Sequence, residues 1–330
     1  MFWPLLLTLS AAPISEAELR AHTRFLASDL LEGRQPGSQG DRLAQAYIAS
    51  QLEALGLATT VQPFELVSVA GHPDVVSLSS GKASLSLQHH EDFIVVSGQQ
   101  SPVSELREAE LVFVGYGITA PEFRWDDFKG VDVKGKVLVV MNSDPEDDPT
   151  LFGGRARLWY GRWDYKYEQA RKLGAAGVFI IHTTPSAGYP WQVVQTSWSG
   201  EQFDLPTTGG HALQLKGWLS ENAARKAFAL GGKSLDALRT KAQSRGFKPV
   251  PLGVKVSTRF ESVVTRKQTA NVLGFLEGTD AKLKQEVVVY TAHHDHLGKG
   301  TGEGDVIYNG AVDNASGVAA LLAIARALSA

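Results

Sequence analysis

The chain has 330 residues, of which 43% are hydrophobic and 20% are charged, and its formal net charge is −3. These values describe a globular protein with enough apolar residues for a core, and the length favours about two domains. The small net charge predicts no nucleic-acid partner, and the absence of cysteine excludes disulfide-linked partners and thiolate metal ligands.

Residues 1–13, MFWPLLLTLSAAP, contain an apolar run followed by the small residues Ser10, Ala11 and Ala12. The pattern resembles a signal peptide without its basic start, and it predicts export to the periplasm or the extracellular space. A plain N-terminal tail is the alternative. No later apolar run reaches the roughly 20 residues that a membrane-spanning helix needs.

Residues 14–57 predict two helices around a loop. Ser15 and Glu18 have the spacing of a capping box before the first helix, and Gly56 is placed to end the second. The loop, residues 31–40, is rich in turn-forming residues. Its charged residues Glu32 and Arg34 are interpreted as a solvated pair.

The middle of the chain predicts a series of short strands and helices. Strands are expected at 61–80, 83–96, 111–114, 137–141, 178–181 and 253–260, and helices at 165–173, 213–228 and 235–242. The neighbouring His89 and His90 would point to opposite faces of a strand, which favours a surface edge over a metal site. The aromatic residues between Trp159 and Tyr167 either line a substrate cleft or pack between domains.

The most informative stretch is 286–328. It begins with the β-branched run 287–290, which predicts a buried strand, followed by His293, His294, Asp295 and His296. On an extended chain His293 and Asp295 share a face and His294 points the other way. Polar groups just beyond the carboxyl end of a sheet strand are in the usual place for a ligand site.

A helix is predicted directly after Asp313, because apolar residues recur at helical spacing from Val318 to Leu328. Asn314 or Ser316 can cap it. Asp313 then lies on the turn that enters the helix. An imidazole and a carboxylate on neighbouring loop tips are the first two ligands that a hydrolytic metal centre requires.

The motifs HHDHLG and GAVDNASGVAALL resemble the metal-binding core of the di-zinc aminopeptidases, a metallopeptidase family that also holds glutamate carboxypeptidases and transferrin receptors. The resemblance implies two zinc ions and peptide substrates. It implies that His293 binds one zinc, that Asp313 bridges both, and that Asp295 orients His293. It is supported by the stretches around residues 28–57 and 268–279, which are similar to family segments.

The resemblance also implies a fold class and a domain plan. The expected fold is α/β, with an incomplete zinc-exopeptidase mixed sheet flanked by helices. The phrases KGKVLVV and ARKLGAAGVFII resemble a protease-associated domain, a β-rich α+β insertion. The expected domains are therefore a peptidase part at 14–105 and 255–330, and an insertion at 106–254.

The implied function is that of a zinc-dependent exopeptidase, in the first place an aminopeptidase that uses a water activated by two zinc ions. In the family, the glutamate that acts as the general base and the remaining zinc ligands follow the DNASG helix. This chain is therefore expected to be an inactive N-terminal part of such an enzyme. Glu303 and Asp305 are not expected to replace them, because a glycine-rich loop gives no rigid support. A carboxypeptidase and a non-catalytic binding protein remain alternatives, and the sequence leaves residue preference and oligomeric state open.

Overall fold

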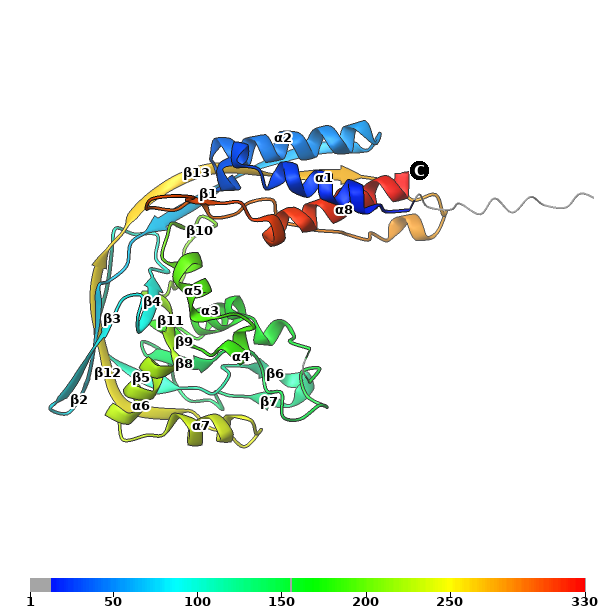
Figure 1. Ribbon diagram of the computed structural model, residues 1–330. Helices are drawn as coiled ribbons and strands as arrows, with labels where there is room; N and C mark the ends of the chain where they lie inside the picture. The colour runs from blue at the N-terminus through cyan, green and yellow to red at the C-terminus, as the bar shows by residue number, and fades with distance from the viewer. Residues whose placement is uncertain (1–12, 155, 330) are drawn as a thin grey trace, which may run out of the picture. The chain divides into compact units, whose positions relative to one another are not determined.

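The computed structural model describes residues 13–154 and 156–329 (Figure 1). The chain forms two compact units: unit 1 consists of Met1–Leu66 and Arg266–Ala330, and unit 2 of Val67–Thr265. Residues 67–105 and 255–265, which the sequence analysis assigned to the peptidase part, belong to unit 2. The expected signal peptide at 1–13 lies outside the described residues, apart from Pro13.

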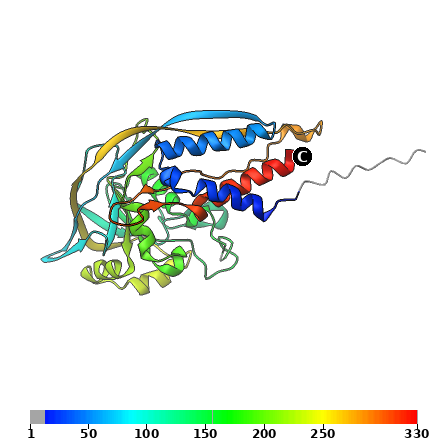
Figure 2. The same cartoon turned by 45° about the horizontal axis from the view of Figure 1, so that its top comes forward.

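The helices of unit 1 pack around a small apolar core. They are α1 (Glu16–Leu26), the 3-10 turn η1 (Asp29–Arg34), α2 (Gln39–Ala54) and α8 (Ser316–Ser329). Figures 1 and 2 both show α1 alongside α8. Leu26 and Leu31 meet Ile48 and Leu52 of α2 and Val318 and Leu322 of α8. As predicted, Ser15 caps α1, with its Oγ accepting from the Glu18 amide at 3.2 Å, and Gly56 follows α2 with a φ of +78°.

The remaining elements of unit 1 are mostly irregular. β1 (Ala58–Ala70) and β13 (Val263–Phe275) are neighbours in one sheet and both continue into unit 2. The others are η4 (Leu283–Gln285), the hairpin strands β14 (Gly298–Lys299) and β15 (Ile307–Tyr308), and the turn η5 (Ala311–Ala315).

The predicted buried strand at 287–290 is wrong. Val287, Val288 and Val289 are 72%, 78% and 71% exposed, and the segment is part of no described strand. An apolar β-branched run becomes a buried strand only when a neighbouring strand bonds to its backbone and a second layer covers its side chains. Among the described residues, no strand takes up that position beside this run.

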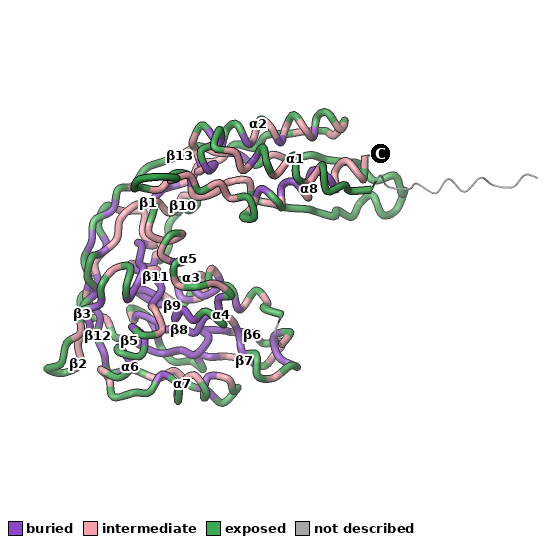
Figure 3. The backbone as a smooth tube through the Cα atoms, in the orientation of Figure 1, coloured by how far each residue is buried: buried purple, intermediate pink, exposed green. Residues whose placement is uncertain are grey.

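Unit 2 is organised by an eight-stranded mixed sheet of order β3-β2-β12-β5-β8-β9-β11-β4. Its strands are β2 (Val75–Ser80), β3 (Ala83–Gln88), β4 (Phe93–Val96), β5 (Val103–Phe113), β8 (Val137–Met141), β9 (Gly177–His182), β11 (Leu215–Ser220) and β12 (Val250–Glu261). The four central strands β5, β8, β9 and β11 are parallel. All residues of β8 and β9 are buried, as the near-continuous apolar runs of parallel strands require (Figure 3).

Helices cover both faces of this sheet (Figure 1). α6 (Glu221–Leu230) and α7 (Leu235–Ala242) pack on one face, and α3 (Trp163–Lys172) and α5 (Trp191–Trp198) pack on the other. Short elements complete the unit: β6 (Thr119–Ala120), η2 (Pro121–Phe123), β7 (Trp125–Asp126), η3 (Trp159–Gly161), α4 (Thr184–Ala187) and β10 (Gln202–Asp204). The predicted α/β class, a mixed sheet flanked by helices, is confirmed.

The predicted helix at 213–228 is wrong in its first half. Leu215–Ser220 forms β11, which pairs in parallel with β9 from Leu215↔Gly177 to Ser220↔His182. A helix begins only at Glu221, where the Ser220 Oγ accepts from the Ala223 amide at 3.2 Å. The apolar spacing favoured a helix, but a strand at this position can pair its backbone N–H and C=O groups with the edge of β9. This pairing outweighs the helical preference of the segment.

One helical stretch in the described residues is long and apolar enough to cross a membrane by length and composition, namely Ala311–Ser329. This differs from the prediction that no later apolar run is long enough to span a membrane. The core helix of a soluble protein meets the same criteria. In this structure Val318, Ala319, Leu322 and Ala323 of the stretch are buried within unit 1.

Candidate metal centre

The two residues predicted to bind metal lie together in unit 1. His293 follows the exposed run 287–290, and Asp313 lies on η5, immediately before α8. The Nε2 atom of His293 is 3.0 Å from Oδ1 of Asp313. As predicted, a cap fixes the start of the helix beside Asp313: the Asn314 Oδ1 accepts from the Gly317 amide at 3.1 Å. The tips of two separate segments therefore present an imidazole and a carboxylate to one point.

Asp295 contacts the opposite nitrogen of the same ring. The His293 Nδ1 is 3.1 Å from the Asp295 carbonyl oxygen and 3.4 Å from its Oδ1. The hydrogen bond to Asp295, together with the charges of Asp295 and Asp313, raises the pKa of His293 to about 9, against the opposing effect of burial. The two carboxylates beside the ring therefore favour its protonated form. A bound cation would replace the Nε2 proton, while Asp295 keeps the proton on Nδ1.

The geometry of this pair fits a shared zinc ion. Zinc binds histidine nitrogen and carboxylate oxygen at about 2.0–2.2 Å, so two such ligands at a tetrahedral angle are roughly 3.3 Å apart. The observed separation of 3.0 Å is close to that value. Within residues 13–154 and 156–329, no group of three or more histidine, aspartate or glutamate side chains converges on a cation position. The described residues therefore bring two candidate ligands, and the partner of one of them, to this point.

His294 points away from His293, as expected for adjacent residues of an extended segment. Its Nε2 is 2.8 Å from Oδ1 of Asp41, a side chain with no exposed surface. Asp41 also accepts from the Gly37 amide at 2.7 Å and from the Gln45 side chain at 2.8 Å. Burial acts to raise the pKa of Asp41, but the hydrogen bonds from His294, Gly37 and Gln45 lower it overall. The sequence analysis missed Asp41, whose position after Ser38 indicates no more than the first turn of a helix.

The interpretation of Glu32 and Arg34 as a solvated pair is wrong for Arg34. Glu32 does form an exposed ion pair, with Lys299 at 2.8 Å, but Arg34 is only 1% exposed. The reason is that several loop carbonyls converge inside unit 1 and need donors, which the guanidinium supplies. Nothing in the composition of the loop distinguishes a buried arginine from a solvated one.

Gly310 is required by the crowding beside Asp313. Its φ is +60°, and a Cβ there would lie 2.6 Å from the His296 ring and 2.7 Å from Nη2 of Arg34. Farther along the same loop, Asp305 turns back on its own chain, where its Oδ1 accepts from the Ile307 amide at 3.1 Å.

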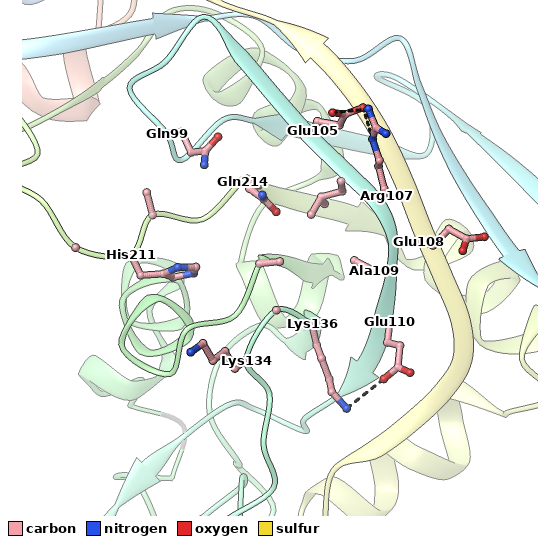
Figure 4. A pocket seen from close by; sticks show the side chains of 15 residues that line it. Gln99, Glu105, Arg107, Glu108, Ala109, Glu110, Lys134, Lys136, His211 and Gln214 are labelled. Atoms are coloured by element: carbon pink, nitrogen blue, oxygen red, sulfur yellow. Dashed lines mark hydrogen bonds and ion pairs between the residues drawn. The ribbon is translucent and has the colours of Figure 1, made fainter.

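Unit 2 has an open cavity of about 920 Å³ beside the starts of β8, β9 and β11 (Figure 4). Four of its charged side chains form two ion pairs: Lys136 Nζ is 3.1 Å from Oε2 of Glu110, and Arg107 Nε is 2.8 Å from Oε1 of Glu105. His211, which lines the same cavity, contacts the Ala175 carbonyl through Nε2. Each of these side chains has a partner within the protein, so we assign them structural roles.

A second cavity of about 910 Å³ lies at the carboxyl ends of β8 and β9 and is lined in part by Trp159. The aromatic residues between Trp159 and Tyr167 were predicted either to line a cleft or to pack between domains, and in the structure they have different surroundings. Tyr165 and Tyr167 are buried inside unit 2, where the Tyr167 hydroxyl donates to the Gly217 carbonyl at 3.1 Å. Packing within one unit was neither of the two alternatives.

One comparison with known proteins concerns the same part of the chain. The model of peptidase family M28 matches residues 271–330, which contain His293, Asp295 and Asp313. No protein of curated function matches the sequence.

Three solved structures are similar to the chain over most of its length. An aminopeptidase from Aneurinibacillus sp. strain AM-1 is 23% identical over 97% of this chain and 60% of that one, with a TM-score of 0.45. Two structures of a zinc aminopeptidase from Bacillus subtilis, BSAP, are 17% and 18% identical over 96% of this chain and 59% and 58% of theirs, each with a TM-score of 0.38.

The chain thus spans about 60% of the length of these aminopeptidases. The match to peptidase family M28 is confined to residues 271–330, the segment that carries both tips of the candidate site and both di-zinc aminopeptidase motifs.

Proposed function

We propose that the protein is a zinc-dependent exopeptidase, in the first place an aminopeptidase, whose metal site includes His293 and Asp313. The observation that supports this most directly is the 3.0 Å separation of His293 Nε2 and Asp313 Oδ1, inside the segment that matches peptidase family M28. The expected export signal at 1–13 would place the enzyme and its peptide substrates outside the cytoplasm.

Each residue of the site has a separate task. Zinc, when bound, polarises a carbonyl oxygen and lowers the pKa of a bound water towards about 7. His293 would bind through Nε2, and Asp295 keeps the other ring nitrogen protonated and the ring in place. Asp313 would bind through its carboxylate and, by the family resemblance, span two ions.

Zinc binding by the purified chain tests the proposal. The zinc affinity of the wild type is measured by competition with a coloured chelator and compared with that of His293→Ala and Asp313→Ala. Both variants should lose most of their affinity, and Asp295→Asn should weaken it about 10- to 100-fold, the usual effect of removing a partner of a metal-bound histidine. His22→Ala is the matched control, because His22 lies in unit 1 and bonds only to Tyr47 among the described residues. Equal zinc affinity in the wild type, His293→Ala, Asp313→Ala and Asp295→Asn would contradict the proposed site.

Activity separates the candidate reactions. The 330-residue chain should show no turnover, because its described residues bring two ligands and no third acidic or imidazole group to one cation position. In a form of the protein that does turn over, peptides acetylated at the N-terminus should resist cleavage, while amidation of the C-terminus should have no effect. The reverse pattern would indicate a carboxypeptidase. Zinc-independent peptide binding without turnover would indicate a non-catalytic member of the fold.

A further inference from the structure

We propose that Arg34 is a positioning residue of the zinc site, which holds the His293 segment and the Asp313 loop at the separation that one cation requires. The inference rests on the proposed function, since it takes these two residues as ligands. The Arg34 guanidinium donates to backbone carbonyls close to these two residues in the chain.

The side chain of Arg34 joins three segments of unit 1. Its Nε donates to the His294 carbonyl at 2.7 Å, its Nη1 to the Asn309 carbonyl at 2.8 Å, and its Nη2 to the Gly310 carbonyl at 3.0 Å. Nη1 also donates to the carbonyl of Leu26, at the end of α1. The side chain is buried, so these bonds do not compete with water.

The positions of these acceptors connect Arg34 to both ligands. His294 is the neighbour of His293, and Gly310 lies three residues before Asp313, directly before the turn η5 that carries it. The guanidinium is planar and its five N–H groups have fixed directions, so it holds the two carbonyls in a defined relative position. A shift of either segment would break bonds to the same rigid group.

The backbone of Arg34 adds a further contact with the first segment, because its carbonyl accepts from the His296 amide at 3.2 Å. Both Glu32 and Arg34 have a positive φ, +46° and +51°, which non-glycine residues rarely adopt. Such conformations persist where surrounding contacts fix them, and they are common at functional sites.

Charge provides a second reason to have arginine at this position. The carboxylates of Asp295 and Asp313 are the two charges that most favour the ionised form of Arg34 and oppose the effect of its burial on the pKa. The same attraction offsets the repulsion between the two carboxylates in the metal-free protein. A neutral side chain of equal size would supply neither the fork of donors nor this charge.

Asp41 fixes the same segment from the other side. It binds the ring of His294 at 2.8 Å, while Arg34 binds the carbonyl of that residue. With the ring and the backbone of His294 both held, the preceding residue is left facing Asp313.

The test compares Arg34→Lys with Arg326→Lys. Arg326 also belongs to unit 1, where it donates to both carboxylate oxygens of Glu18 at 2.6 and 2.9 Å, but it bonds to neither ligand segment. In both variants lysine retains the positive charge and removes the planar set of N–H donors of the guanidinium. Zinc affinity, measured by chelator competition below the unfolding temperature, should fall about 10- to 100-fold for Arg34→Lys. It should change by no more than about twofold for Arg326→Lys.

A double-mutant cycle separates positioning from a general loss of structure. In a His293→Ala background, Arg34→Lys should have little further effect on the remaining zinc affinity, because the ligand it positions is gone. An equal effect in both backgrounds would overturn the proposal. If Arg34→Lys does not fold, Asp41→Asn serves as the second variant, and wild-type affinity in that protein would overturn it.

The outcomes also distinguish the two proposals. If the wild type binds no zinc, or binds it independently of His293, the proposed function itself fails. If the wild type binds zinc through His293 and Arg34→Lys binds it as tightly, only the positioning role fails.

Discussion

At the residue scale, the His89 ring stacks on the His72 ring in unit 2. Their imidazoles stack with centroids 3.7 Å apart, and His90 lies 4.1 Å from His89 on the other side. The Nδ1 of His72 and the Nε2 of His89 are buried without a hydrogen-bond partner in the described structure. The sequence analysis treated His89 and His90 as a surface edge and did not anticipate this stack.

This stack predicts that acid destabilises unit 2. Burial first, and then the nearby His72 and His90, lower the pKa of His89 from 6.5 to about 4. Between these values the unfolded chain binds a proton that the folded chain does not, so the stability contribution is complete above pH 6.5 and is lost as the pH falls towards 4.

The variant His89→Phe tests this, because it keeps a ring in the stack and removes the titrating group. Tryptophan fluorescence reports mainly on unit 2, since six of the seven tryptophans of the chain lie in it. The urea midpoint of the wild type should be lower at pH 5 than at pH 7, and the difference should be smaller in His89→Phe. Parallel behaviour of the two proteins would contradict the assignment.

At the element scale, α8 is the helix that holds Asp313 in place. It begins three residues after Asp313, and its buried face contacts α1 and α2. The sequence predicted this helix well, because the apolar residues recur at helical spacing and Asn314 provides a cap. The run 287–290 had an equally clear pattern but lacks a neighbouring strand, and its valines are exposed.

Removing part of the buried face of α8 should loosen the metal site. Leu322 is 1% exposed, and Leu322→Ala should lower the free energy of unfolding of unit 1 by about 2–5 kcal/mol through lost burial and a cavity. Leu328 lies on the same helix and is 55% exposed, so Leu328→Ala should cost less than about 0.5 kcal/mol. Hydrogen exchange of α8 amides measures both changes, and equal effects would show that this face is not the packed one.

At the scale of the whole molecule, the two units have separate cores. The apolar cluster that contains Leu26 and Leu322 draws only on unit 1, and the two clusters around the eight-stranded sheet draw only on unit 2. A ligand that binds one unit should therefore stabilise that unit.

Zinc should raise the thermal midpoint of unit 1 and leave that of unit 2 unchanged. A ligand that binds only the folded state stabilises it by about 2.7 kcal/mol at 100 times its dissociation constant. Hydrogen exchange of the α1 and α8 amides measures the unfolding of unit 1, and tryptophan fluorescence measures mainly that of unit 2. A zinc-dependent shift in the fluorescence midpoint, or none in helix exchange, would contradict a site confined to unit 1. Chelator should reverse the shift.

The helices of unit 1 and most strands could be predicted from the sequence, and so could the positions of His293 and Asp313 at the tips of two segments, because these features depend on local order. Spacing and caps define α1, α2 and α8, continuous apolar runs define β8 and β9, and adjacent positions in an extended segment separate His293 from His294. The folded structure was needed to show that Arg34 and Asp41 are buried near His293 and Asp313, that Leu215–Ser220 is a strand, and that 287–290 is exposed. Burial and strand pairing are set by groups far away in the chain, so local sequence carries no record of them.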